Sequence, residues 1–361
     1  MRPVRFLLMA CAILVLAAPA GARNRARPSA VSARIEALVL RYGAKGLGVE
    51  DATVLVAKDG VPVFRGSVGL ANREWNIKSD PQVVYRIGSI TKQVVATAIL
   101  QLAAAHKLSL DESIATYLPD SPPAWRAVTV RHLLLHTSGI ANFTALPEFD
   151  GRTWTYKTAD DVIRLVRDRP LEGAQGAAFS YDNTGYVLLG RIVETVSGES
   201  LGKYLSAQVF GPLGMRHSGF VSDKVLPHRA TGYVFDGSAW NDTPWISNVV
   251  ESGAGGLYST ADDLLLWDQA LYDPRRLKLT DLSVMFADYG HGFGFGYVVG
   301  REGGHRVWWH NGHVGGFGAM LARYPDDRLT IIVLSNDDDA HVEALSRDLA
   351  ALLLNRPKAL R

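Results

Sequence analysis

The sequence predicts an α/β fold of the α+β kind, in which both ends of the chain contribute to one sheet and a helical segment is inserted between them. Strand-like apolar runs occur near residues 53–64 and then only after residue 296. Helical and loop patterns dominate from residue 89 to about residue 250. No Pro- or Ser-rich linker and no internal repeat separates these regions, so one folded unit is expected.

The predicted elements follow in chain order. Two strands at residues 53–57 and 61–64 flank a turn at residues 58–60, which has the sequence Lys-Asp-Gly. A helix without Gly or Pro spans residues 91–105, and its apolar side chains occupy nearly every face, as in a buried central helix. Helical spacing recurs from residue 186 to residue 193. Strands return at residues 296–300, 307–310, 318–324 and 329–335, before an amphipathic helix at residues 342–354.

These elements define the predicted domain. Residues 32–357 form a single domain, with an α/β part at residues 32–88 and 251–357 and a helical part at residues 89–250. Ser89 lies at the junction of the two parts, which is where ligand clefts tend to form.

Ser89-Ile90-Thr91-Lys92 places a hydroxyl and an amine three residues apart at the start of the central helix. Residues three apart share a helix face, so the Lys92 amine can reach the Ser89 hydroxyl. A serine hydroxyl becomes a good nucleophile when a base takes its proton, and burial lowers the pKa of a lysine toward that role. The same spacing recurs at Ser200 and Lys203, where we interpret Ser200 as a helix N-cap and Lys203 as a solvated residue.

Two further motifs carry chemistry. Tyr181-Asp182-Asn183 is interpreted as a loop before a helix, which projects Tyr181 as a proton relay and Asn183 as a hydrogen-bonding partner of substrate and lysine. His310-Asn311-Gly312 ends a predicted strand in which Arg306, Trp308 and His310 share one face, and Gly312 lets a substrate backbone approach closely. Taken alone, each motif is more often a packed tyrosine, a turn or a core histidine.

The order of these motifs resembles the serine β-lactamase and penicillin-binding protein superfamily, specifically its class C β-lactamase-like branch. Further similar segments are Val130-Arg131-His132-Leu133-Leu134-Leu135-His136-Thr137-Ser138-Gly139, Asn183-Thr184-Gly185-Tyr186, Pro212-Leu213-Gly214-Met215 and Gly255-Gly256-Leu257-Tyr258-Ser259-Thr260. The resemblance implies a β-lactamase/transpeptidase-like fold, with an antiparallel sheet flanked by helices and an all-helical subdomain.

The resemblance also implies roles for residues. Ser89 would be the nucleophile, Lys92 the base and Tyr181 the proton relay. Asn183 and His310 would bind substrate, and the backbone N–H groups of Ser89 and His313 would form the oxyanion hole.

Two positions depart from true class C β-lactamases. His310 stands where a lysine is usual, and Asp182 stands where serine is common. A histidine is mostly neutral at pH 7, which weakens capture of a substrate carboxylate unless His310 is protonated, or Arg306 or another arginine replaces it. Histidine occurs at this place in DD-peptidase and D-aminopeptidase-like relatives.

Residues 1–22 have the pattern of a cleaved export signal. A short basic segment precedes an apolar run at residues 6–18, and small-residue cleavage sites end at Ala20 and Ala22. Residues 23–31 are expected to be a disordered linker. The mature protein is expected to be periplasmic or secreted, without a stable membrane span; an uncleaved N-terminal membrane anchor is the alternative.

The net charge, the single cysteine and the spacing of the histidines limit which partners and cofactors are expected. The whole chain carries +2, and the signal contains Arg2 and Arg5, so the mature protein is near neutral and no nucleic acid is expected as a partner. Cys11 is the one cysteine and lies in the signal. His305, His310 and His313 lack companions at metal spacing, so neither a metal nor a cofactor is expected.

The sequence therefore predicts an exported serine hydrolase that forms an acyl-enzyme on a small-molecule or peptide substrate. D-amino-acid peptides, such as cell-wall peptide, lead the substrate classes. The alternatives are a small-molecule carboxylesterase, a β-lactamase, or a catalytically silent binding relative.

Overall fold

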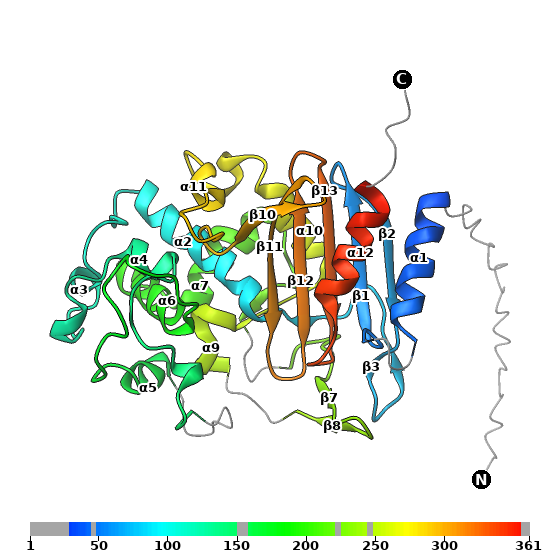
Figure 1. Cartoon of the computed structure of the whole chain (residues 1–361), viewed down its shortest axis with the longest axis horizontal. Coiled ribbons are helices and arrows are strands. Elements are labelled where there is room, and N and C mark those ends of the chain that lie inside the picture. Colours follow the sequence, from blue (N-terminus) through cyan, green and yellow to red (C-terminus); the bar gives the residue numbers. More distant parts are fainter. Residues whose placement is uncertain (1–28, 45–47, 150–157, 221–224, 244–247, 355–361) are drawn as a thin grey trace, which may run out of the picture.

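The computed structural model describes residues 29–44, 48–149, 158–220, 225–243 and 248–354. The predicted export signal and most of the predicted linker lie outside these residues. Figure 1 shows a sheet with helices on both of its faces and, beside it, a group of helices.

The main sheet has six strands in the order β10-β11-β12-β13-β1-β2, and all neighbouring strands are antiparallel. The N-terminal strand β1 pairs with the C-terminal strand β13, for example through Val54 opposite Val333. This pairing confirms the prediction that both ends of the chain complete one sheet. The strand bounds are β1 Ala52–Lys58, β2 Val61–Val68, β10 Val298–Glu302, β11 His305–His313, β12 Gly318–Tyr324 and β13 Leu329–Ser335.

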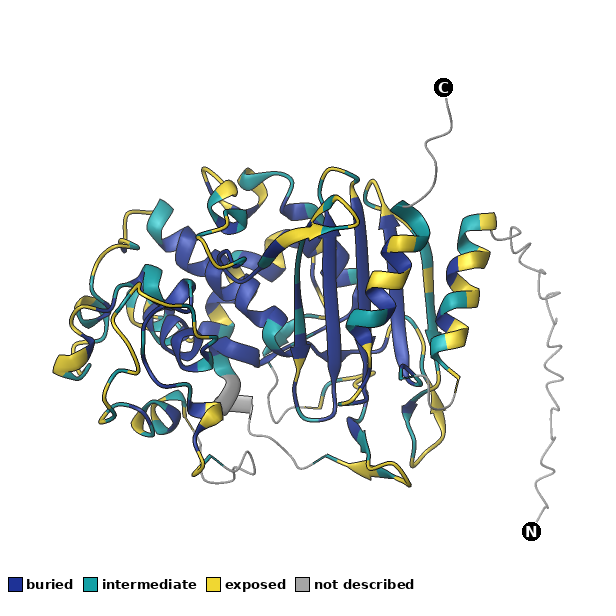
Figure 2. Cartoon of the chain, in the orientation of Figure 1, coloured by how far each residue is buried: buried dark blue, intermediate teal, exposed yellow. Residues whose placement is uncertain are grey.

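The central strands are buried on both faces, which explains their nearly continuous apolar sequences. In β1, Val54 and Val56 join the apolar cluster beneath α1 (Ala30–Tyr42) and α12 (Val342–Leu354). Leu55 and Ala57 point the other way, into the larger cluster that contains α2 and α10. Figure 2 shows these strands as almost uniformly buried.

Helix α2 (Thr91–Ala104) lies between the sheet and the group of helices, and it confirms the predicted central helix. All twelve residues from Thr91 to Leu102 are buried, so the helix is covered on every side. Its N-terminus is thereby fixed at the junction of the two halves. The remaining α-helices are α3 Ile114–Tyr117, α4 Val130–Leu134, α5 Ala159–Arg164, α6 Asn183–Ser197, α7 Leu201–Leu205, α8 Gly211–Leu213, α9 Asn248–Gly255, α10 Ala261–Ala270 and α11 Ser283–Phe286.

Three features of the fold differ from the sequence prediction. Strand β10 begins at Val298 rather than at Gly296, because Gly296 has a φ of +78° and lies against the backbone of α2. Strand β11 continues to His313, because its pairing with β12 extends to that residue. Short strands that the sequence did not predict form three small sheets: β3 Leu70–Asn72 with β4 Ile77–Lys78, β5 Tyr85–Arg86 with β9 Leu257–Ser259 and β6 Gly219–Phe220, and β7 Tyr233–Phe235 with β8 Trp240–Asp242. Of these strands, β6, β7 and β8 lie within the predicted helical part at residues 89–250.

A buried ion pair joins α10 to the sheet. Arg323 Nε on β12 lies 2.8 Å from Asp268 Oδ1, and the two side chains are 1% and 0% exposed. The Thr330 hydroxyl donates to the other oxygen of Asp268 at 2.7 Å. Because a buried charge without a partner is costly, each member of this pair depends on the other.

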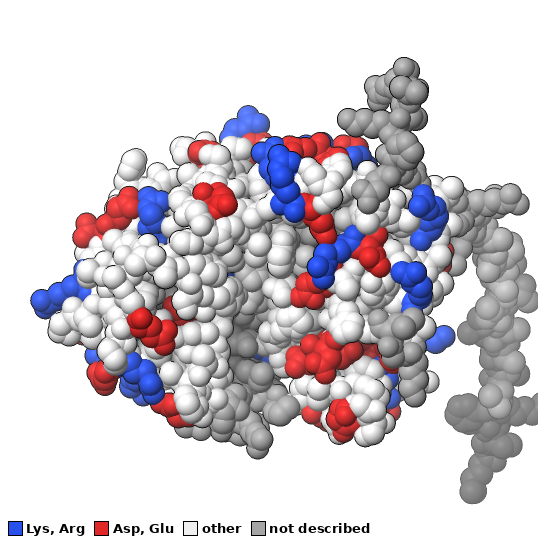
Figure 3. All heavy atoms as spheres, in the orientation of Figure 1, with Lys and Arg blue, Asp and Glu red and all other residues white. Residues whose placement is uncertain are grey.

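Charged side chains of both signs are interspersed on the face shown in Figure 3. Within the described ranges, no helix is both long and apolar enough to cross a membrane.

Candidate active site

Ser89 lies in a single 3-10 turn, η1 (Gly88–Ile90), directly before α2. Gly88 has a φ of +48°, and a Cβ there would come within 2.8 Å of the His313 backbone nitrogen. A Cβ on Gly312 would lie 2.1 Å from the Ile87 carbonyl oxygen and 3.0 Å from the Ser89 nitrogen. The two glycines therefore allow η1 to pack directly against the end of β11. The close backbone approach predicted at Gly312 is made by this chain's own turn rather than by a substrate.

Lys92 projects from the first turn of α2 and is 0% exposed. Its Nζ donates hydrogen bonds to Ser89 Oγ at 2.9 Å, Asn183 Oδ1 at 2.8 Å and the Ala254 carbonyl at 2.8 Å. These three acceptors come from η1, α6 and α9, so the amine is held where three elements meet. The predicted reach from Lys92 to Ser89 is confirmed.

Tyr181 supplies a second neighbour of the Ser89 hydroxyl. Its OH donates to Ser89 Oγ at 2.9 Å, and its ring centroid lies 4.9 Å from Lys92 Nζ. Tyr181 lies 92 positions after Ser89 in the sequence, yet its hydroxyl meets the Ser89 oxygen in the fold. Ser89 Oγ has two groups at 2.9 Å that can exchange a proton with it.

Tyr181 and Asp182 lie in the predicted loop before a helix, and Asn183 is the first residue of that helix, α6. Asp182 is the N-cap, and its carboxylate accepts the backbone N–H groups of Thr184 at 2.7 Å and Gly185 at 2.9 Å. Burial raises the pKa of Asp182 to about 7, although these two hydrogen bonds oppose the shift. The presence of an aspartate at position 182 therefore has a structural reason, because it caps the helix that carries Asn183.

The backbone N–H of His313 is oriented toward Ser89. Val314 and Phe317 exchange both backbone hydrogen bonds, at 3.0 and 3.1 Å, across the β11–β12 turn. The neighbouring pair, His313 with Gly318, is therefore a non-hydrogen-bonded pair of the antiparallel ladder. The His313 N–H consequently points away from β12, to the side where η1 lies. This geometry suits the oxyanion hole that the resemblance implied for Ser89 and His313.

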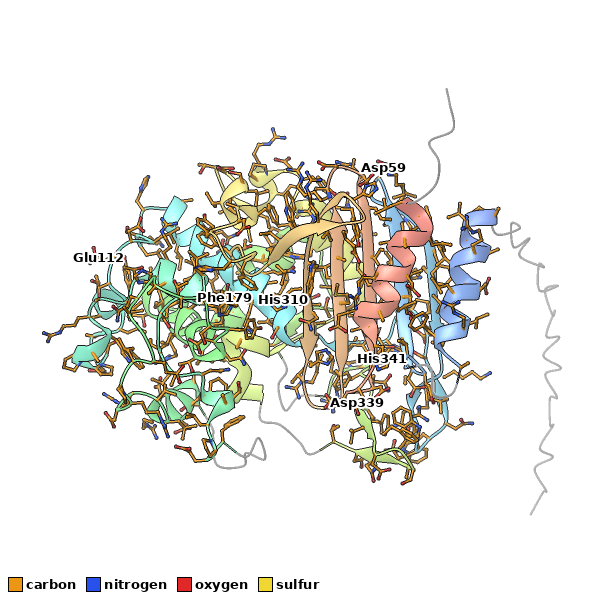
Figure 4. All side chains as sticks on the ribbon, viewed as in Figure 1. Asp59, Glu112, Phe179, His310, Asp339 and His341 are labelled. Atoms are coloured by element: carbon orange, nitrogen blue, oxygen red, sulfur yellow. The ribbon has the colours of Figure 1, made fainter. Side chains whose placement is uncertain are left out.

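His310 is buried on β11 at the same junction. Its Nδ1 lies 2.6 Å from the Asn311 carbonyl, and its Nε2 is buried with no hydrogen-bond partner among the described residues. Burial, together with the nearby Lys92 side chain, lowers the pKa of His310 to about 3. Figure 4 labels His310 and Phe179 where the group of helices meets β11, and the Phe293 ring packs near both, with centroids 5.9 Å from His310 and 5.5 Å from Phe179.

Burial therefore disfavours the imidazolium form that binding of a carboxylate by His310 would require. Arg306, the alternative cation, lies four residues earlier on β11 and pairs with Asp326. Neither side chain offers a free positive charge beside Ser89.

The second Ser-x-x-Lys sequence has the structural role predicted for it. Ser200 caps α7 by accepting the Lys203 backbone N–H at 3.4 Å. The Lys203 side chain is 71% exposed and pairs with Glu199. This copy lies in a surface helix and makes no catalytic pair.

Comparison with known proteins agrees with this geometry. The sequence model of the Beta-lactamase family matches residues 33–356. The chain belongs to the beta-lactamase family. It is a serine hydrolase of that family, and its mixed helix and antiparallel-sheet fold is the β-lactamase/penicillin-binding protein fold.

Three relatives illustrate the membership. Penicillin-binding protein 4* of Bacillus subtilis (strain 168) is 29% identical over 342 residues, covering 85% of this chain and 73% of the relative. D-aminopeptidase of Gluconobacter oxydans (strain 621H) is 29% identical over 335 residues, covering 89% and 62%. The structure of the octameric penicillin-binding protein homologue from Pyrococcus abyssi superposes with a TM-score of 0.79 at 28% identity, covering 90% and 77%.

The structure also reveals site residues that sequence reasoning missed. Glu343 of α12 accepts from Asn311 Nδ2 at 2.6 Å and lies 3.3 Å from His313 Nε2. Its carboxylate raises the pKa of His313. His136 lies against Tyr181, with ring centroids 4.5 Å apart. The His136-Thr137-Ser138-Gly139 segment was recognised in the sequence, but its position beside Tyr181 depends on the tertiary fold.

Among the described residues of this beta-lactamase-family enzyme, no group of three His, Cys, Asp or Glu side chains could hold a metal ion. His305 lies 2.7 Å from Asp327 at the far end of β11 from His313.

Proposed function

We propose that this chain is an exported serine hydrolase that cleaves D-amino-acid amides and short D-amino-acid peptides through an acyl-enzyme. The observation that carries the proposal is the position of Ser89 Oγ, 2.9 Å from both Lys92 Nζ and the Tyr181 OH. A serine needs such neighbours to lose its proton as it attacks a carbonyl carbon.

In the proposed acylation step, Ser89 Oγ bonds to the carbonyl carbon of the scissile amide while its proton passes to Lys92, which accepts it as a neutral amine held by Asn183 and Ala254. The carbonyl oxygen becomes an oxyanion that accepts the backbone N–H groups of Ser89 and His313. Tyr181 relays the proton to the amide nitrogen, so the C–N bond breaks and the amine leaves.

Deacylation reverses these roles. Water attacks the acyl carbon, its proton passes to the Lys92–Tyr181 pair, and the C–O bond to Ser89 breaks. The Ser89 oxygen regains a proton and the acid product leaves. The Asn183 Oδ1 contact at 2.8 Å holds Lys92 in place through both steps.

Two observations favour D-amino amides as the preferred substrates, ahead of peptides with a carboxylate beside the scissile bond. Burial keeps His310 neutral, and Arg306 is engaged with Asp326, so neither offers a cation for a substrate carboxylate. One relative that is 29% identical to this chain is a D-aminopeptidase. Together these features favour D-amino amides over carboxylate-bearing β-lactams.

A substrate panel on the purified protein tests this proposal. D-alanine amide and L-alanine amide form the stereochemical pair, and a D-Ala-D-Ala peptide, a p-nitrophenyl ester and nitrocefin complete the panel. We expect turnover of the D-amide well above that of the L-amide, slow nitrocefin turnover, and no activity in Ser89→Ala.

Other outcomes of the panel would replace this proposal. Turnover confined to the ester would identify a carboxylesterase, and fast nitrocefin turnover would identify a β-lactamase. Binding without turnover of any compound would identify a silent relative.

Export is proposed from the sequence of residues 1–22, with its basic start, apolar run and small-residue cleavage sites. N-terminal sequencing of the protein recovered outside the cytoplasm should begin near Gly21 or Arg23. A protein in the membrane fraction that still begins at Met1 would instead indicate an uncleaved anchor.

A further inference from the structure

His136 is a buried histidine that the proposed reaction leaves without a role. It follows α4, is 1% exposed and has a φ of +56°. Residues other than glycine are uncommon in this left-handed conformation, although asparagine, aspartate and histidine adopt it more often than the rest. In the buried His136, surrounding contacts hold the backbone in it. The contacts of His136 are made mainly with the segment around Tyr181.

Three interactions connect His136 to the segment around Tyr181. The His136 carbonyl accepts the Ser180 backbone N–H at 2.9 Å. Its ring nitrogen Nδ1 accepts the Asp182 backbone N–H at 3.0 Å. Its ring stacks on the Tyr181 ring, with centroids 4.5 Å apart and planes at 28°. His136 therefore holds the backbone on both sides of Tyr181 as well as the Tyr181 ring itself.

The hydrogen bond to Asp182 fixes the protonation of His136. Because Nδ1 accepts an N–H, the ring proton must lie on Nε2 and the ring must be neutral. Burial and the nearby Lys92 hold the pKa of His136 well below its usual value, in agreement with this assignment. The ring of Phe293, 4.8 Å away, packs against the imidazole edge-on and limits its rotation.

We propose that His136 is a positioning residue that holds the Tyr181 hydroxyl against the Ser89 oxygen. The inference rests on the proposed function, since it assigns His136 to the Tyr181 proton relay. His136 acts through Tyr181 and touches no reacting atom itself. Small displacements of a proton relay cost rate steeply, so loss of these contacts should slow acylation more than it weakens binding.

The chain offers two complementary variants of His136. His136→Phe keeps a ring to stack on Tyr181 but removes the acceptor for the Asp182 N–H. His136→Asn keeps an acceptor and suits the left-handed backbone, but it removes the stack. His132→Ala is the matched control: His132 lies four residues earlier and completes the capping box of α4 with Thr129.

The readout is the rate of labelling by a fluorophosphonate probe, analysed as kinact and KI. We expect kinact to fall about 10–100-fold in His136→Phe, the loss typical of a misplaced catalytic group, while KI changes less than about twofold. His136→Asn should recover part of the rate. His132→Ala should lower the melting temperature without changing kinact.

A double-mutant cycle with Tyr181→Phe separates positioning from general destabilisation. If His136 acts through Tyr181, His136→Phe should cause no further loss of kinact in the Tyr181→Phe background. Equal losses in both backgrounds, or an unchanged kinact in His136→Phe, would overturn the inference. If His136→Phe does not fold, the same cycle with His136→Asn decides the question.

These outcomes are distinguishable from failure of the proposed function. Labelling that persists in Ser89→Ala, or absence of any labelling in the unmodified protein, would refute the acyl-enzyme proposal and His136 with it. Labelling of Ser89 with an additive cycle would refute the role of His136 alone.

Discussion

The neutral state of His310 makes a measurable prediction about stability and pH. Burial lowers the pKa of His310 from 6.5 to about 3, so between these values the unfolded chain binds a proton that the folded chain does not. The stability that neutral His310 contributes is therefore complete above pH 6.5 and is lost as the pH falls toward 3. Replacement of His310 by the non-titrating glutamine should remove this dependence.

The size of the effect follows from the shift. Each pH unit in this window corresponds to about 1.36 kcal/mol, so acidification from pH 6.5 to 4.5 should cost about 2–3 kcal/mol through His310. The side chain is 2% exposed, so solvent screening does not reduce this value greatly. His136 has a lowered pKa as well, but it is present in both proteins, and its contribution cancels in the comparison.

Urea unfolding at pH 7.5 and pH 4.5, followed by tryptophan fluorescence, measures this difference. Between the two pH values, His310→Gln should lose about 2–3 kcal/mol less stability than the unmodified protein. His217→Gln, at a side chain that is 66% exposed, is the control and should leave the loss unchanged. Equal losses in His310→Gln and the unmodified protein would show that His310 is not held neutral and would restore it as a candidate carboxylate ligand.

Three further predictions concern the base, the proton relay and the buried ion pair. Lys92→Ala should reduce acylation about 10²–10⁴-fold, the usual effect of losing a general base, and near-normal labelling kinetics in this variant would mean that another group takes the proton. Tyr181→Phe should slow acylation or deacylation while circular dichroism and melting temperature remain close to normal. Asp268→Asn should destabilise the fold by about 3–5 kcal/mol in urea unfolding, because Arg323 would keep its buried charge without a partner; a loss below about 1 kcal/mol would contradict this account.

The parts of the fold that were predictable are those with strong local patterns. Strands β12 and β13 and helix α12 have the predicted bounds because their apolar residues are continuous or have helical spacing. The end of β11 depends on hydrogen bonds to β12, which no local pattern encodes. Strands of two or three residues, such as β5 and β6, are too short to show any periodicity.

Some residues of the candidate site could likewise be predicted from the sequence, and others could not. Ser89, Lys92 and Tyr181 could be selected from the sequence because each belongs to a motif, and the motifs occur in a recognised order. The charge of His310 could not be predicted, since it depends on burial beside Lys92. The contacts of His136 with Tyr181 and of Glu343 with His313 join residues far apart in the chain, so only the folded structure reveals them.

The central claim is that Ser89 forms the covalent intermediate. Mass spectrometry of peptides from protein treated with a fluorophosphonate or a penicillin tests it most directly. We predict that the label is found on Ser89 and that Ser89→Ala is not labelled, whereas Ser200→Ala is labelled like the unmodified protein. A label on Ser200, or labelling that persists in Ser89→Ala, would contradict the account.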